Sequence, residues 1–261
     1  ASAATLSGIE MTGAGSIEIT GAVESQDYDE IDVSGGFTFS GQSDSFAASL
    51  KDTADQTYTL KGTSLTCAAS STLNGKTISP AGDAGETITI SSLSSSHNLG
   101  GVTIATTISG SQANFTGILP VATLTINADI GCPASKVTGK TISGSGTITL
   151  KTIDGDVGLA ATTELSNISN TMVIQNGIAA NAALTGTLGT GSLTIHEDLT
   201  TTAAKVTGKT IAPSGTPRIT LSTLDANSNL SDISTLMTIT GTQNNFSGNL
   251  GTGNLIMNAN L

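Results

Sequence analysis

"TTISGSQANFTGILPVATLTINADI", residues 106–130, aligns without a gap with "MTITGTQNNFSGNLGTGNLIMNANL", residues 237–261. A second set of matches begins at residues 74, 138 and 207, with "NGKTISPAGDAGETITI", "TGKTISGSGTITL" and "TGKTIAPSGTPRITL". Internal repetition at such periods is typical of solenoids, propellers and repeat arrays. The sequence therefore predicts a repeat architecture.

A shorter motif recurs inside these repeats. It consists of an apolar residue, an outward residue and a second apolar residue, preceded by Gly or a small polar residue. Alternation with a period of two is the signature of strands that bury one face. Twelve segments fit, their starts lie 18 to 30 residues apart, and only Thr106 breaks the apolar rule. The predicted inward pairs are Ile17/Ile19, Phe37/Phe39, Tyr58/Leu60, Ile88/Ile90, Thr106/Ile108, Leu124/Ile126, Ile148/Leu150, Met172/Ile174, Leu193/Ile195, Ile219/Leu221, Met237/Ile239 and Leu255/Met257.

The mean spacing of about 22 residues suits one coil of a β-solenoid, and three coils make a longer repeat of about 65 residues. We predict an all-β fold, a right-handed parallel β-solenoid (β-helix) of about twelve coils. It forms one domain over residues 1–261, with three-coil super-repeats at approximately 8–72, 73–136, 137–205 and 206–261. The hand follows the general preference for right-handed crossovers. The alternative is a tandem array of β-sandwich repeats of about 65 residues, which would need more closely spaced turn signals and linkers.

Threonine dominates the position between the two inward residues. It stands at nine of these positions: 38, 59, 89, 107, 125, 149, 194, 220 and 238. Stacked strands would align these side chains in one outward row, where β-branched neighbours pack well. Flat Thr-x-Thr arrays resemble ice-binding faces, and ice binding is therefore one alternative function. A regular plane is not predicted, because Gly36, Ala105, Arg218 and Leu236 interrupt the first outward column.

The composition limits the classes of function. Charged residues are 11% of the chain, against about 25% in an ordinary soluble protein, and aromatic residues are 3%. The net charge of −11 disfavours nucleic acids and anionic membranes as partners, since both are bound by basic patches. No run of 18 apolar residues occurs, so no transmembrane segment is expected. The small residues of the opening "ASAATLSG" fit cleavage after export.

Gly-, Thr- and Asn-rich coils such as "GSGTITLKTI" (144–153) and "GTGSLTIHEDL" (189–199) resemble those of bacterial surface β-solenoids. These are autotransporter passenger domains, filamentous-haemagglutinin-like exoproteins and large repetitive adhesins. The resemblance implies an extracellular, cell-surface protein with a structural or adhesive role, and it carries over no catalytic residue. We therefore expect a non-enzymatic protein that assembles by head-to-tail or lateral homo-oligomerisation into a filament or layer. A host or environmental surface is a further expected partner.

Other functions remain as alternatives. The coils at both ends of the chain look ordinary, so we expect either the shaft of a larger adhesin or ends that neighbours cover. A polysaccharide-cleaving β-helix would need an acidic or basic cluster in a groove, and basic residues are sparse here. A glycan-binding module would need exposed aromatic residues, and Tyr28 is the candidate considered outside the predicted coil interiors.

Acidic residues offer one weak candidate metal site. Asp27, Asp29 and Asp32, with Glu30 between them, lie in "DYDEID". Carboxylates at alternate positions of a strand point the same way, and Ca²⁺ prefers several oxygen ligands. Calcium is therefore the alternative to a solvated acidic turn without a cofactor. "TIDGDVG" at residues 152–158 is a weaker candidate of the same kind.

The remaining motifs favour structural roles. The triplet "GKT" at residues 75, 139 and 208 lacks the upstream glycine of a phosphate-binding loop, because Ser70, Ala134 and Ala203 stand in its place. A turn is therefore predicted at each triplet. Cys67 and Cys132 fall in coils about 14 Å apart, beyond the reach of a disulfide, so we predict buried small hydrophobes or bridges between subunits. The two histidines, His97 and His196, are too few for a Cys/His metal centre, and His196 is expected on the surface.

Overall fold

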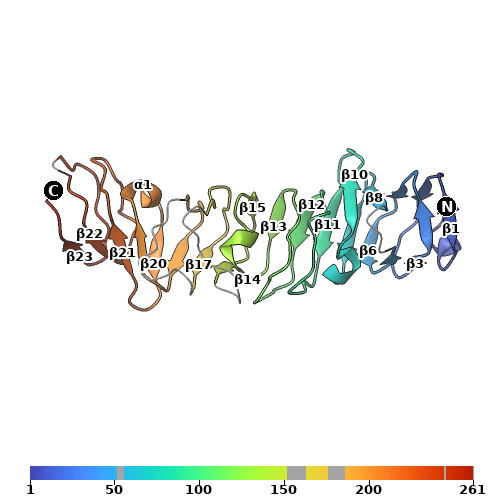
Figure 1. Cartoon of the computed structure of the whole chain (residues 1–261), viewed down its shortest axis with the longest axis horizontal. Helices are drawn as coiled ribbons and strands as arrows, with labels where there is room; N and C mark the ends of the chain where they lie inside the picture. The colour runs from blue at the N-terminus through green and yellow to red at the C-terminus, as the bar shows by residue number, and fades with distance from the viewer. Residues whose placement is uncertain (52–55, 152–162, 176–185, 244, 261) are drawn as a thin grey trace. The chain divides into compact units, whose positions relative to one another are not determined.

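The computed structural model describes residues 1–51, 56–151, 163–175, 186–243 and 245–260. The fold is all-β, with parallel strands stacked as a β-solenoid of about 11 turns (Figure 1). Every strand pair with an assigned register in the described residues is parallel, which excludes the tandem-sandwich alternative, because sandwich sheets are antiparallel. "TIDGDVG" at 152–158 lies outside the described residues. The chain divides into two compact units, Ala1–Ala128 and Asp129–Leu261.

The first unit contains short strands, three or four residues long in most cases, and two 3₁₀ turns. They are η1 (Ala4–Leu6), β1 (Met11–Gly13), β2 (Ile17–Ile19), β3 (Asp27–Tyr28), β4 (Ile31–Val33), β5 (Phe37–Phe39), β6 (Ser43–Phe46), β7 (Ser49–Leu50), β8 (Thr57–Leu60), β9 (Ser64–Cys67), η2 (Ser70–Leu73), β10 (Thr77–Pro80), β11 (Thr87–Ile90), β12 (Ala105–Ile108) and β13 (Leu124–Ile126). Two main columns of strands run through this unit, β2–β5–β8–β10 and β6–β9–β11–β12–β13. Two smaller pairs, β1–β4 and β3–β7, complete its described sheets.

The second unit repeats this plan. Its elements are β14 (Ile130–Cys132), η3 (Ala134–Lys136), β15 (Ile142–Ser143), β16 (Ile148–Leu150), β17 (Met172–Ile174), β18 (Leu193–Ile195), β19 (Leu199–Thr201), the single α-helical turn α1 (Ala203–Val206), β20 (Ile211–Pro213), β21 (Arg218–Leu221), β22 (Leu236–Ile239) and β23 (Leu255–Met257). Its columns are β14–β16–β17–β18–β20 and β19–β21–β22–β23. Paired residues lie from 18 positions apart, as in Met237 and Leu255, to 24, as in Ile148 and Met172.

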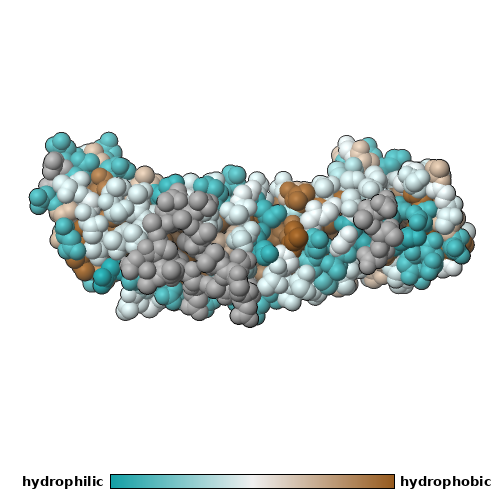
Figure 2. All heavy atoms as spheres, in the orientation of Figure 1, coloured by the Kyte–Doolittle hydropathy of each residue, from teal (hydrophilic) through white to brown (hydrophobic). Residues whose placement is uncertain are grey.

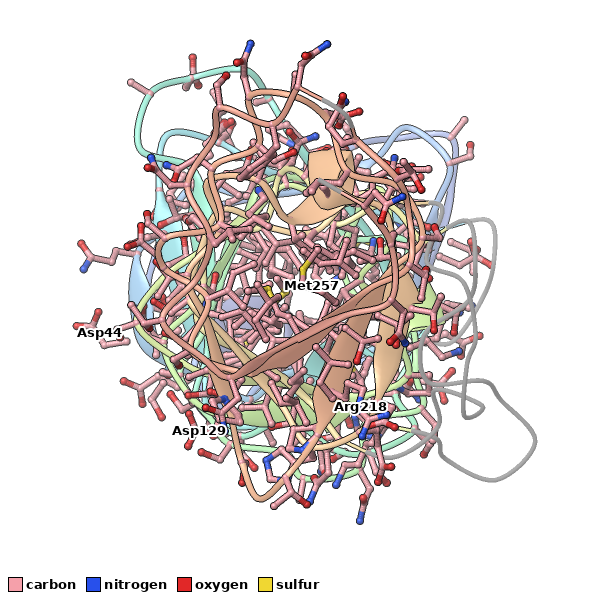
Figure 3. The ribbon with its side chains drawn as sticks, turned by 90° about the vertical axis from the view of Figure 1, so that its left-hand side faces the viewer. Asp44, Asp129, Arg218 and Met257 are labelled. Atoms are coloured by element: carbon pink, nitrogen blue, oxygen red, sulfur yellow. The ribbon has the colours of Figure 1, made fainter. Side chains whose placement is uncertain are left out.

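The predicted alternation of inward and outward residues is confirmed. All twelve segments are strands, and eleven of the twelve inward pairs are buried. Thr106, the polar exception, is buried because its hydroxyl donates to the carbonyl oxygen of Ile104 at 2.8 Å. The last pair differs, since Met257 is 39% exposed. Figure 3 shows Met257 near the middle of its coil and Arg218 toward the outside, so Met257 belongs to the core of its coil.

The prediction of one continuous outward row of threonines is wrong. Tyr58 pairs with Phe37 and Ile78, whereas the next predicted segment begins at Ile88, which pairs with Leu65 and Thr106. In the second unit the predicted row is interrupted in the same way between β18 and β21, because β18 pairs with β20 and β21 pairs with β19. The reason is geometric. Each coil carries strands on more than one face of the solenoid, and the alternation of inward and outward residues does not show on which face a strand lies. The threonines therefore form short rows on different faces, of which Thr66, Thr89, Thr107 and Thr125 form one.

Two further residues correct the predicted exposure. Thr238 was expected to point outward, but only 6% of it is exposed, because Thr220 and Ile256 flank it in the sheet. Tyr28, the candidate for an exposed aromatic platform, is 1% exposed. Its ring packs 5.4 Å from that of Phe37, and its hydroxyl donates to the carbonyl oxygen of Ala3 at 3.0 Å. Tyr28 is therefore a core residue and no platform for a sugar, and its burial raises its pKa to about 12.

Candidate functional site

The "GKT" triplets form the most regular feature of the surface, a corner that occurs three times. Each corner begins with a short helical turn, η2, η3 or α1, and passes through the triplet into a short strand, β10, β15 or β20. The glycine adopts a left-handed backbone in all three, with φ of 72°, 70° and 68° at Gly75, Gly139 and Gly208. Glycine alone takes this conformation without a steric penalty. The predicted turns are confirmed, and a phosphate-binding loop is not formed.

Hydrogen bonds in both directions join each corner to the following coil. In the first unit, the N–H of Gly75 donates to the carbonyl oxygen of Asn98 at 2.8 Å. The N–H of Asn98 donates in return to Oδ1 of Asn74 at 2.8 Å. A threonine hydroxyl replaces the asparagine oxygen in the other corners, where Thr138 and Thr207 accept from Glu164 and Asn229. This exchange explains why Asn or Thr precedes the glycine in the repeated motif.

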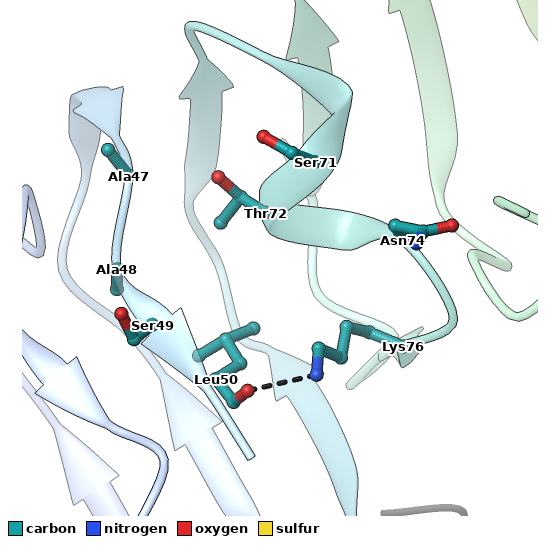
Figure 4. Close-up of a pocket in the computed structure, with 8 residues that line it drawn as sticks. All are labelled: Ala47, Ala48, Ser49, Leu50, Ser71, Thr72, Asn74 and Lys76. Carbon is teal, nitrogen blue, oxygen red and sulfur yellow. Dashed lines mark hydrogen bonds between the residues drawn. The ribbon is translucent and has the colours of Figure 1, made fainter. Parts of the chain in front are cut away.

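The lysine of the triplet ties its corner to earlier carbonyl groups. The ammonium of Lys76 donates to the carbonyl oxygen of Leu50 at 2.9 Å (Figure 4) and to that of Lys51 at 3.0 Å. Lys209 does the same with the carbonyl oxygens of Leu188 and Gly189, at 3.3 and 2.9 Å. In the middle corner, burial lowers the pKa of Lys140 below its ordinary value. These contacts give the lysines a role in joining coils.

A shallow hollow lies beside two of the corners. In the first unit it has a volume of about 430 Å³ and is lined by Ala47, Ala48, Ser49, Leu50, Ser71, Thr72, Asn74 and Lys76 (Figure 4). In the second unit the equivalent hollow has about 340 Å³ and is lined by Ser166, Thr187, Leu188, Thr190, Ala204, Lys205, Thr207 and Lys209. The described residues of both linings offer hydroxyl, amide and ammonium groups, and none of these residues carries a carboxylate, imidazole or thiol. Such a lining supplies hydrogen bonds but no acid–base pair.

A serine–histidine pair escaped the sequence analysis, because its members lie 27 residues apart. Ser70 Oγ and His97 Nδ1 are 2.9 Å apart, and Ser70 Oγ also accepts the N–H of Ser94 at 2.9 Å. Ser70 is completely buried, so its hydroxyl cannot reach a substrate. The pair resembles the contacts of the corners, because it joins η2 to the following coil. His196, the other histidine, lies half-buried just after β18.

The structure separates the calcium candidates into two settings. Asp27 and Asp29 lie together, with the Asp29 N–H donating to Oδ1 of Asp27 at 3.3 Å. A side-chain hydrogen bond with Asp27 raises the pKa of Asp29 above its ordinary value. Asp32 instead forms an ion pair with Lys51, at 3.1 Å between Oδ2 and Nζ. Among the described residues no three His, Cys, Asp or Glu side chains form a group that could hold a metal, and the calcium assignment stays a prediction.

Both cysteines are buried free thiols. Burial raises the pKa of Cys67 and of Cys132 to about 12, although Lys136 and Lys151 lower the pKa of Cys132 slightly. A thiol of this kind is a poor nucleophile and metal ligand, because the thiolate is the reactive form. The interpretation of both residues as buried small hydrophobes is therefore confirmed.

One acidic side chain organises a turn that the sequence analysis did not single out. Glu86 is 9% exposed, and its carboxylate accepts N–H groups from Gly62, Ala81 and Gly82 at 3.1 to 3.2 Å. Burial opposes its charged form, but these bonds and one from Asp83 together lower its pKa below the ordinary value. The only signal in the sequence is a Glu just after the glycines and aspartate of "AGDAGE".

Comparison with protein-family models, curated proteins and solved structures finds no match to this chain. In the described part of the chain, no helix has the length and apolar character needed to cross a membrane. The stacked parallel strands define the class of this chain, a β-solenoid repeat protein.

Proposed function

We propose that this chain is a non-enzymatic structural protein of the bacterial cell surface, a β-solenoid that stacks coil on coil into a filament or layer. The shaft of a larger adhesin is the same role in a longer chain. The observation that carries this proposal is the mode of stacking, in which parallel strand pairs such as β22–β23 join one coil to the next.

The outer edge of β23, which is paired with β22 on one side only, offers the same kind of groups by which the internal coils join. Its backbone N–H and C=O groups on the free side have no strand partner in the described residues, and Ile256 and Met257 are each 39% exposed. Natural edge strands usually carry charges that prevent pairing with other chains. No Asp, Glu, Lys or Arg occurs between Asp232 and the last residue, so this edge lacks such protection. A further coil, from a second copy or from a longer chain, would complete its hydrogen bonds and cover Met257.

The test is electron microscopy and sedimentation velocity of the 261-residue chain, with and without millimolar calcium. We expect concentration-dependent filaments or sheets. Ile256→Lys places a charge on the free edge and should abolish axial growth. Thr57→Lys is the matched control, because Thr57 is also exposed but lies in β8, which has partners on both sides.

Isolated particles at every concentration would contradict self-stacking, and growth unaffected by Ile256→Lys would contradict the role of β23. Dependence on calcium that Asp27→Asn removes would convert the weak acidic candidates into a site. Hydrolysis of a polysaccharide by the purified chain would contradict the non-enzymatic assignment.

A further inference from the structure

Two large apolar side chains that lie three positions apart in the sequence are exposed in the first unit. Ile118 is 48% exposed and Val121 is 60% exposed, whereas Leu119 and Pro120 between them are buried. Figure 2 shows apolar surface gathered at the coils of β12 and β13, in the middle of the view. Single exposed apolar residues are ordinary, but an adjacent pair that the fold does not require calls for an explanation.

The second unit contains an internal control that shows the fold does not require them. The equivalent residues, 131 positions later, are Asn249 and Thr252, and both are exposed. The backbone contacts are the same: the N–H groups of Ile118 and Asn249 donate at 3.0 Å to the carbonyl oxygens of His97 and Ser228, which are themselves equivalent. The same backbone structure therefore forms with polar residues at these positions, and the apolar pair occurs in the first unit but not in the second.

Gly100, which lies next to Ile118, also differs from its equivalent in the second unit. A Cβ added at Gly100 would lie 3.0 Å from Cγ2 of Ile118, closer than an ordinary contact. The equivalent position in the second unit is Ser231, beneath Asn249. The glycine thus makes room for the isoleucine where the isoleucine occurs, which indicates that the apolar pair is accommodated as a unit.

The distribution of charge along the chain indicates what kind of partner could cover Ile118 and Val121. Residues 1–86 contain twelve acidic and three basic side chains, a net charge of −9, whereas residues 87–128 contain no Asp, Glu, Lys or Arg. The whole chain has a net charge of −11, so two copies repel each other at most approaches. The uncharged coils around Ile118 and Val121 allow a second copy to approach without this repulsion. A basic partner would instead be attracted to the acidic coils that precede residue 87.

We propose that Ile118 and Val121 form the centre of a lateral contact between two copies of this chain. This proposal rests on the proposed function and specifies its lateral assembly. The contact is two-fold symmetric, with the uncharged coils of one copy on those of the other. Only this antiparallel arrangement directs the acidic coils of the two first units away from each other. A parallel arrangement would place them side by side.

The test uses the double variant Ile118→Asn/Val121→Thr, which gives the first unit the side chains that its own repeat carries and therefore keeps the fold. Sedimentation velocity of the full chain should show a concentration-dependent lateral dimer that strengthens with salt, since salt screens the remaining repulsion. The double variant should weaken this dimer at least tenfold. Hydrogen exchange should show protection of the amides around residues 112–125 in the dimer of the native sequence and no such protection in the variant.

A second variant tests sufficiency. Ser231→Gly/Asn249→Ile/Thr252→Val builds the apolar pair in the second unit and should restore association when it is added to the double variant. Unchanged dimerisation in Ile118→Asn/Val121→Thr, or a native chain that stays monomeric at high concentration and high salt, would overturn the proposal. Ile256→Lys distinguishes it from axial stacking, because that variant should lose filaments while keeping the lateral dimer.

Discussion

The side-chain amide of Gln112 donates to the carbonyl oxygen of Leu93, nineteen residues earlier, at 2.9 Å. In the second unit Gln243 makes the equivalent bond to Leu224 at 3.2 Å. Each glutamine also accepts, through Oε1, the N–H of the asparagine two residues later, Asn114 or Asn245. The repeated "SQANF" and "TQNNF" segments therefore recur because they fasten one coil to the coil before it.

Removing this bond should weaken the first unit. We expect Gln112→Ala to destabilise it by about 1–2 kcal/mol, since the carbonyl of Leu93 then loses its partner and the following turn loses its acceptor. Chemical denaturation followed by hydrogen exchange of the first-unit peptides measures the effect. Gln42→Ala is the control, because Gln42 is exposed and its side-chain amide donates to nearby Asp44 on the same coil. Equal losses in the two variants would show that the link between coils contributes nothing.

The corner lysines should contribute through their hydrogen bonds to backbone carbonyls. Lys209→Met keeps most of the side-chain volume but removes both donors to Leu188 and Gly189. We expect a loss of about 1–3 kcal/mol, in the range for bonds made by charged groups. Lys205→Met, in α1, changes the net charge by the same amount, and no hydrogen bond from its ammonium to a described residue is found. A comparable loss in Lys205→Met would assign the effect to charge instead.

Replacing a buried threonine whose hydroxyl has no partner should raise the stability of the chain, whereas the substitutions above should lower it. Oγ1 of Thr238 is buried and has no hydrogen-bond partner among the described residues, so Thr238→Val should stabilise the second unit by about 1 kcal/mol. Thr106→Val should give no such gain, because the Thr106 hydroxyl is already bonded to the carbonyl of Ile104. Thermal unfolding of both variants provides the comparison. A loss of stability in Thr238→Val would mean that its hydroxyl has a partner in solution.

Acid should weaken the turn that Glu86 organises. The folded-state pKa of Glu86 is lowered, so its contribution is complete above the ordinary value of 4.5 and is lost as the pH falls through the folded pKa. Glu86→Gln should therefore be less stable than the native chain at pH 7 and should lose less stability on acidification. Denaturation midpoints between pH 7 and pH 3 measure this slope. Glu10→Gln, at an exposed position, should leave the slope unchanged.

Where one local rule determines the structure of this chain, the sequence predicts it correctly. All twelve segments that alternation predicted are strands, and the glycine of each "GKT" predicted a turn that the left-handed φ at Gly75, Gly139 and Gly208 confirms. Prediction from the sequence failed where the pairing of strands depends on which face of a coil a strand occupies. The wide interval between Tyr58 and Ile88 was the available sign of a change of face, and an average period concealed it.

The candidate sites were harder to predict for a related reason. Lys209, Gln112 and Glu86 act on backbone groups that lie far away in sequence, and nothing in the neighbouring residues identifies those partners. Tyr28 was misplaced because β3 is only two residues long, too short for alternation to reveal its buried side.

Paired residues are separated by short and nearly constant distances along the sequence, which affects how the chain folds and how duplication can lengthen it. Each strand meets its partner 18 to 24 residues away, as in β22 with β23 and β16 with β17. The entropy lost in closing a loop depends on loop length, so every added turn costs about the same as the one before it. Duplication of a whole segment, such as the one that separates Gln112 from Gln243, lengthens the molecule without making it topologically harder to fold.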